Sequence, residues 1–168
     1  MTIKTVMCCA VLASASMVIP GRANAQSDDD KKFVATAAQG DVNEIALSEL
    51  AEQKAENPAV KSFAHKMVTE HKEMTSSMKP YADEWGMNPP VGPDEDHKKE
   101  IEKLKGLNGH DFDKQYMDDM VSDHSKALDA FTKEAKDTKN AKVRATVLKG
   151  KTHVAAHKNM AYDLKKKL

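Results

Sequence analysis

The feature that most constrains the fold is a helical spacing of apolar residues that runs through four segments of about 25 residues each. Apolar side chains recur three and four positions apart in these segments, and glycine and proline cluster at a few points. Such spacing gives each helix one apolar face that has to pack against another helix, and the alternation typical of β-strands does not occur. The sequence therefore predicts an all-α fold.

Two short breaks and one long break separate the four predicted helices. The first helix ends before Asn57, and Pro58 suits the first turn of the second, where its missing N–H is no loss. The third helix is expected to start near Asp111, and a polar turn around residues 137–140 precedes the fourth. Because short turns join antiparallel neighbours, the predicted architecture is a four-helix bundle made of two helical hairpins.

The long break, residues 86–110, contains three of the six prolines of the chain. A polar stretch inside it, about residues 94–105, is predicted to form a short extra helix. His97 and His110 also lie in this linker, and we expect both side chains to face solvent.

The first 25 residues have the three parts of a secretory signal peptide. Lys4 supplies a positive charge, residues 6–19 form an apolar core, and Ala23-Asn24-Ala25 is a small-x-small cleavage site. The core is shorter than the roughly 20 residues that a membrane span needs, and no later stretch approaches that length. We therefore expect a Sec-type signal peptide at 1–25, a single domain at 26–168 without a transmembrane segment, and a bacterial periplasmic or secreted location.

Removal of this signal peptide changes what the composition implies. Cys8 and Cys9, the two cysteines of the chain, leave with it, so the mature domain is held together by core packing or by a metal rather than by disulfides. Loss of Lys4 and Arg22 leaves 24 basic against 26 acidic side chains. This near-neutral balance gives no reason to expect nucleic acid as a partner, and an unknown protein partner stays open.

Two segments of the chain repeat one pattern, FAHKMVTEHKEM at 63–74 and YMDDMVSDHSKAL at 116–128. In each copy an aromatic residue and three further residues are followed by Met-Val, a hydroxylated residue, an acid and a histidine. The histidine is His71 in the first copy and His124 in the second. The repeat raises the question whether the two histidines are halves of one buried site.

Distances along the predicted helices place the polar residues of the inner faces at one level. At a rise of about 1.5 Å per residue, Glu44 and His71 both lie about 20 Å from the first short turn. His124 lies at a matching distance from the second short turn, and His153 and His157 follow on the fourth helix. Every helix of the predicted bundle thus carries a metal-capable side chain near mid-height.

We predict from this match that Glu44, His71, His124 and His157 bind a transition metal. Each shares a stripe of apolar or small residues that faces the core. Imidazole ligands with one carboxylate suit zinc, copper or iron. The predicted function is an exported, non-catalytic bundle that buffers metal or contributes to envelope stress tolerance.

Other interpretations of the same residues stay open. The histidines and Glu44 could form a hydrogen-bonded network that only fixes helix register, which would make the protein a structural or interaction module. Glu70 and Asp123 each precede a histidine and are either orienting partners of the ligands or surface acids.

Two further chemistries have weaker support. A methionine stripe on the second helix suits Cu(I) but is more typical of core filling; its members are Met67, Met74 and Met78. The sequence contains no nucleophile triad, phosphate-cradling glycine loop or dinucleotide fingerprint, so it leans away from an enzyme. A redox reaction at an open metal position near Tyr116 is the one catalytic alternative left.

A resemblance to a known family is carried by three stretches: GDVNEIALSELAEQKAENPAVKSFAHKMVTEHKEM (40–74), FDKQYMDDMVSDHSKAL (112–128) and THVAAHKNMA around His157. They resemble a bacterial family of domains of unknown function, labelled outer-membrane or periplasmic proteins. The resemblance covers about residues 31–164 and implies a ferritin-like bundle and an exported location, but no settled activity. Members commonly show Leu-Pro-x-Leu-x-x-His near the last helix; here KGKTHVAAH replaces it, so His153 departs from the pattern.

The ferritin-like resemblance does not extend to a di-iron centre. Di-iron carboxylate bundles place a glutamate three residues before the ligating histidine on two of their helices. In this chain valines occupy those positions, namely Val68, Val121 and Val154. Ferroxidase or iron-storage activity is therefore not expected.

Overall fold

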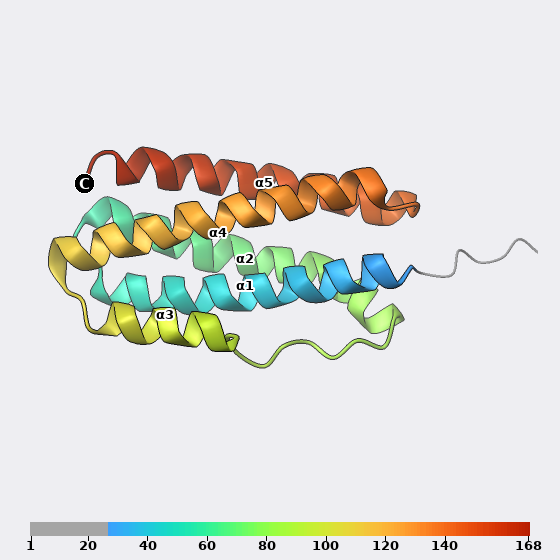
Figure 1. Ribbon diagram of the computed structural model, residues 1–168, viewed down its shortest axis with the longest axis horizontal. Coiled ribbons are helices and arrows are strands. Elements are labelled where there is room, and N and C mark those ends of the chain that lie inside the picture. Colours follow the sequence, from blue (N-terminus) through green and yellow to red (C-terminus); the bar gives the residue numbers. More distant parts are fainter. Residues whose placement is uncertain (1–26) are drawn as a thin grey trace, which may run out of the picture.

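The computed structural model describes residues 27–168, which form five α-helices and no strand (Figure 1). The helices are α1 (Asp28–Lys54), α2 (Pro58–Glu84), α3 (Glu95–Lys105), α4 (Gly109–Asp137) and α5 (Ala141–Lys165). The all-α prediction is confirmed for this part of the chain, and α3 is the predicted extra helix of the linker. The predicted signal peptide lies outside the described residues.

The helix starts follow from local hydrogen bonding. Four polar residues act as N-caps, each accepting a hydrogen bond from a backbone N–H two or three positions ahead. They are Ser27, Asn57, Asp94 and Asn140. The cap at Asn57 is followed by Pro58 at the first position of α2, as the sequence predicts.

The four long helices are arranged as two hairpins. α1 packs mainly on α2 and α4 mainly on α5, while contacts of α1 with α4 and of α2 with α5 join the hairpins. The connection after α2 runs back along the molecule to α3, which lies against α1 and α4 (Figure 1). As a result, α2 and α4 run in the same direction (Figure 1).

The core consists of two apolar clusters with a polar layer between them. One cluster lies near the α1–α2 turn and contains Leu47, Phe63, Met67, Phe112, Tyr116 and Met120, among others. The other lies near the α4–α5 turn and contains Phe33, Val34, Met78, Phe131, Val143 and Val147, among others. Every long helix places at least one buried polar residue between these clusters; five such residues are Asp41, Glu44, His71, His124 and His157.

None of the helices in residues 27–168 combines the length and the apolar character that a membrane span requires.

Candidate metal centre

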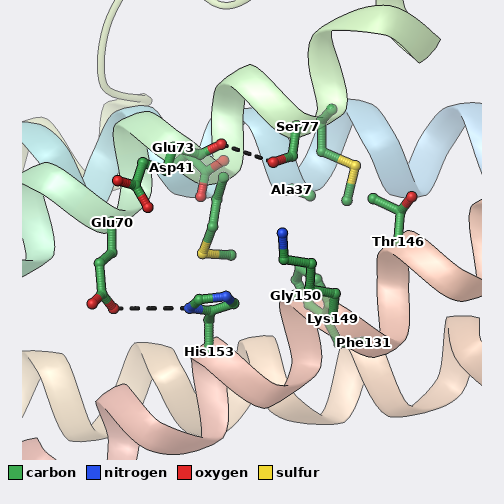
Figure 2. A pocket seen from close by; sticks show the side chains of 12 residues that line it. Ala37, Asp41, Glu70, Glu73, Ser77, Phe131, Thr146, Lys149, Gly150 and His153 are labelled. Carbon is green, nitrogen blue, oxygen red and sulfur yellow. Dashed lines mark hydrogen bonds and ion pairs between the residues drawn. The ribbon is translucent and has the colours of Figure 1, made fainter.

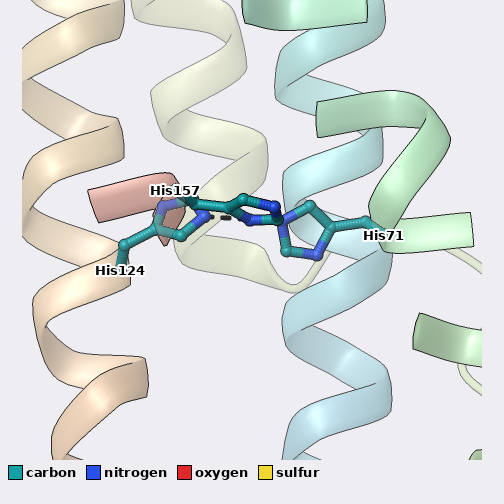
Figure 3. A group of neighbouring side chains, drawn as sticks. All are labelled: His71, His124 and His157. Carbon is teal, nitrogen blue, oxygen red and sulfur yellow. Dashed lines mark hydrogen bonds between the residues drawn. The ribbon is translucent and has the colours of Figure 1, made fainter. Parts of the chain in front are cut away.

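Three histidines from three helices point at one another in the polar layer (Figure 3). His71 comes from α2, His124 from α4 and His157 from α5, and all three are buried. The distances between their ring centroids are 5.2, 5.3 and 5.5 Å, so the rings form a nearly equilateral triangle. One nitrogen from each ring lies within 4.8 Å of those from the other two. The structure therefore brings together three of the four residues predicted as ligands.

One nitrogen of every ring is held by an acceptor at the edge of the triangle. The pairs are His71 Nδ1 with Asp41 Oδ1 at 2.9 Å, His124 Nδ1 with the Met120 carbonyl at 2.8 Å, and His157 Nε2 with Glu70 Oε2 at 2.5 Å. Carboxylate or carbonyl partners of this kind typically orient histidines that bind a metal through the other nitrogen.

The second nitrogen of each ring is the one available for a ligand. Nε2 of His71 and Nε2 of His124 lie 3.4 Å apart, and Nδ1 of His157 is buried without a hydrogen-bond partner. Because the Met120 carbonyl can only accept, Nδ1 of His124 donates and Nε2 of the neutral ring carries a lone pair. Tetrahedral ligation at about 2.0 Å places two nitrogens about 3.3 Å apart, so the spacing of the His71 and His124 nitrogens fits a transition metal.

Burial keeps the histidines neutral, which is the form that binds metal. It lowers the pKa of His71 and of His157 to about 4 and, together with the charges of the other two rings, that of His124 to about 3. Burial acts in the opposite direction on Asp41, whose pKa it raises to about 7. Near neutral pH, Asp41 is thus poised between its charged and its protonated form.

Glu44 is the predicted ligand that the structure does not bring into the triangle. Its Oε1 lies 3.7 Å from Nδ1 of His124, the nitrogen that already bonds the Met120 carbonyl, and its Oε2 is buried without a partner. Burial and then the charge of Asp123 raise the pKa of Glu44 well above its usual range. The α1 residue that contacts the triangle is Asp41, one helical turn earlier, which the sequence analysis missed.

Glu70 extends the centre toward the surface. Besides bonding His157, its Oε2 lies 3.9 Å from Nδ1 of the half-exposed His153 on α5, and Figure 2 shows this pair facing each other across a pocket between α2 and α5. Burial disfavours ionisation of Glu70, but hydrogen bonds from Lys66 and His157 outweigh it and lower its pKa to about 2. Of the two roles left open for Glu70, its position matches that of an orienting partner, and His153 lies one step outside the triangle.

The linker histidines differ from each other in environment. His110 is exposed, as predicted. The prediction that His97 faces solvent is wrong, because α3 packs on α1 and α4 and turns this side chain inward, where it is 21% exposed. Its Nδ1 lies 2.8 Å from Oδ1 of Asp94, and its Nε2 lies 3.8 Å from Oδ2 of Asp123. Asp123 therefore pairs with His97, not with its neighbour His124.

A groove of about 620 Å³ connects the polar layer with the surface along α1 and α4. Polar residues on its wall include Asp41, Glu44, His71, Asp94, His97, Asp123, His124 and Lys126, and apolar ones include Phe33, Met74, Phe131 and Val154. Two histidines of the triangle, His71 and His124, are therefore open to a small ion that enters along this groove.

Three residues of the alternative chemistries lie in other environments. Met67 and Met78 are buried in the two apolar clusters, one in each. The Tyr116 hydroxyl lies 2.9 Å from Oγ of Ser48, and burial raises the pKa of the phenol. Met74 alone of the methionine stripe lines the groove.

Comparison with known proteins gives a family but no activity. The family described as a domain of unknown function (DUF4142) matches residues 17–164. None of the curated proteins is significantly similar to the chain.

Several solved structures have the same fold. A DUF305 fragment from Deinococcus radiodurans is 15% identical, covers 84% of this chain and 98% of its own, and has a TM-score of 0.75. A structure described as CopM in the Cu(II)-bound form is 19% identical, with coverage of 82% and 96% and a TM-score of 0.69. A DUF305 protein from Streptomyces coelicolor, described as presumed secreted, is 13% identical, with coverage of 81% and 89% and a TM-score of 0.70. At these identities the likeness establishes the fold alone.

Proposed function

The chain belongs to the DUF4142 family of domains of unknown function, and we propose that it binds one transition-metal ion through His71, His124 and His157. The observation that carries this proposal is the arrangement of the six ring nitrogens. Three are held by Asp41, Glu70 and a backbone carbonyl, Nε2 of His71 faces Nε2 of His124, and one nitrogen of each buried ring lies within 4.8 Å of those of the other two.

Copper is the first candidate for the ion, with zinc and iron as alternatives. A site of three imidazoles suits all three metals, and divalent copper has the highest intrinsic affinity for such ligands. The neighbours described as CopM in Cu(II)-, Cu(I)- and Ag-bound forms support the same choice. Three protein ligands leave a fourth position for water or for a side chain such as Glu44, the remaining predicted ligand.

The protein acts in this proposal as an exported metal-buffering bundle that contributes to envelope stress tolerance. The predicted signal peptide and the description of a structural neighbour as presumed secreted support export. The long connection between α2 and α4 supports a ferritin-like bundle, because ferritin-like folds have one such crossover.

A structural role without metal is the second candidate, and a specific observation favours it. If Asp41 is protonated, it donates to Nδ1 of His71, and Nε2–H of His71 can then donate to Nε2 of His124. Two neighbouring rings of the triangle are satisfied in this way, and the network fixes the register of the two hairpins.

Elemental analysis of the protein, purified from the periplasm without a metal-affinity tag, tests between the two roles. We expect about one metal ion per chain and a higher melting temperature after addition of copper, zinc or iron. His71→Ala and His124→Ala should each lose the ion, whereas His110→Ala, which removes an exposed histidine, should keep it. No ion and no melting shift would assign the histidines to the structural role.

A further inference from the structure

A second cluster of metal-capable side chains lies outside the histidine triangle, where α3 packs on α4. His97 and Glu100 lie one turn apart on α3, and Asp123 reaches them from α4. Nε2 of His97 lies 3.9 Å from Oε2 of Glu100 and 3.8 Å from Oδ2 of Asp123. One ligand atom from each residue lies within 4.8 Å of the other two.

One carboxylate oxygen of each acid in this cluster lacks a hydrogen bond, whereas Oδ1 of Asp123 accepts one from Nζ of Lys126 at 2.8 Å. Oε2 of Glu100 and Oδ2 of Asp123 are buried atoms without a hydrogen-bond partner, and both flank Nε2 of His97. Oε2 of Glu44, a residue only 6% exposed, is also buried without a partner, and Glu44 lines the same groove as His97 and Asp123. Burying carboxylate oxygens without hydrogen bonds is costly, and a cation bound between Glu100 and Asp123 would offset that cost.

The imidazole of the cluster is oriented in the same way as those of the triangle. Nδ1 of His97 lies 2.8 Å from Oδ1 of Asp94, and Oδ2 of Asp94 accepts a hydrogen bond from the Asn43 amide at 2.8 Å. Asp94 is held further as the N-cap of α3. Histidines that bind a metal typically have their other ring nitrogen held by a carboxylate in this way.

We propose that His97, Glu100 and Asp123 form a second cation site, which takes a divalent ion that favours carboxylate ligands, such as Mn²⁺. Two carboxylates and one imidazole suit such an ion, whereas three imidazoles favour copper or zinc. His97 and Asp123 line the groove, so the ion has access from solvent. The site shares no ligand with the histidine triangle and does not depend on the function proposed for it.

The test is a titration of Mn²⁺ into the metal-free chain, followed by electron paramagnetic resonance. The free ion gives a signal, and binding to the protein removes it. We expect saturable binding of one Mn²⁺ per chain, unchanged in His71→Ala. Asp123→Asn and Glu100→Gln should each weaken it at least about tenfold. Asp129→Asn on α4 and Glu102→Gln on α3, which alter exposed acids of the same helices, should leave it unchanged.

Two results would overturn the proposal. If the wild-type chain shows no saturable Mn²⁺ binding, the cluster is an ion-pair network around a charged His97, whose pKa Asp123 and Asp94 raise to about 9. If Mn²⁺ stays bound in Asp123→Asn and Glu100→Gln but is lost in His71→Ala, the ion occupies the histidine triangle. Circular dichroism of every variant distinguishes a loss of binding from a loss of fold. Glu100 is about one-third exposed, so its substitution disturbs packing least.

Discussion

His71 and His124 face each other through their Nε2 atoms, 3.4 Å apart, although their Nδ1 atoms are already held by Asp41 and by the Met120 carbonyl. With Asp41 ionised, both Nε2 atoms carry lone pairs, which suits a metal. With Asp41 protonated, one Nε2 carries a proton and the pair is a hydrogen bond. The protonation state of Asp41 therefore selects between the two arrangements.

We predict that metal affinity depends on pH through this proton. Burial raises the pKa of Asp41 to about 7, so below pH 7 the metal has to displace one proton from the Asp41–His71 pair. The affinity for Zn²⁺ should be constant above about pH 7 and fall about tenfold per unit as pH decreases below it. Below about pH 4, protonation of His71 and His157 should make the decrease steeper. Competition titrations with a chelator of known affinity measure this dependence.

Asp41→Asn provides the matched variant for that titration. The amide oxygen can still accept from Nδ1 of His71, but the amide does not titrate. We expect binding in this variant to be independent of pH between about 7 and 4, whereas Asp41→Ala should weaken affinity about 10- to 100-fold at all pH values. An unchanged slope in Asp41→Asn would show that the proton comes from another group.

The stability of the bundle should depend on Gly150, where α5 approaches α4 closely. A Cβ added to Gly150 would lie 2.5 Å from Cε1 of Phe131, a ring that is itself packed edge-on against Phe33 at a centroid distance of 4.9 Å. Gly150→Ala should therefore lower the free energy of unfolding by about 1–2 kcal/mol, measured with urea. Gly40→Ala is the control, because no atom lies within 4 Å of its added Cβ; there we expect a stabilisation of about 0.5–1 kcal/mol.

A further prediction on stability concerns Asp113, which connects the start of α4 to the α1–α2 turn through hydrogen bonds. Its buried carboxylate accepts hydrogen bonds from the backbone N–H groups of Glu56 at 3.1 Å and Asn57 at 2.7 Å. Asp113→Ala leaves both donors without a partner and should destabilise the protein by about 2–3 kcal/mol. Asp113→Asn, which retains one acceptor oxygen, should lose less. Equal losses in a thermal or urea unfolding series would contradict this account.

The helices and the level of the histidines were predictable because both follow from local counting. A spacing of three and four residues determines where α1, α2, α4 and α5 lie, and a rise of about 1.5 Å per residue places His71 and His124 at the same height. Counting does not decide which of two carboxylates on one helix face contacts a ring. Asp41 and Glu44 lie about one turn apart on α1, and the choice between them depends on side-chain length and on the packing of both hairpins.

The position of His97 was not predictable for a different reason. Most of α3 is charged, and a short polar helix looks the same in sequence whether it lies free in solvent or against other helices. Its packing on α1 and α4 depends on where the connection after α2 leads the chain, which no local pattern encodes. Leu104 is the one residue of this helix that is fully buried in the core.

The origin of the three histidines on two different hairpins has a consequence for how an ion would be gained and lost. The first hairpin contributes His71, and the second contributes His124 and His157. Neither hairpin alone offers all three histidines. An ion bound by all three would therefore link the two hairpins to each other. Before the two hairpins have packed together, the chain could not bind an ion with all three rings. The lifetime of the bound ion would then depend on how rarely the hairpins separate.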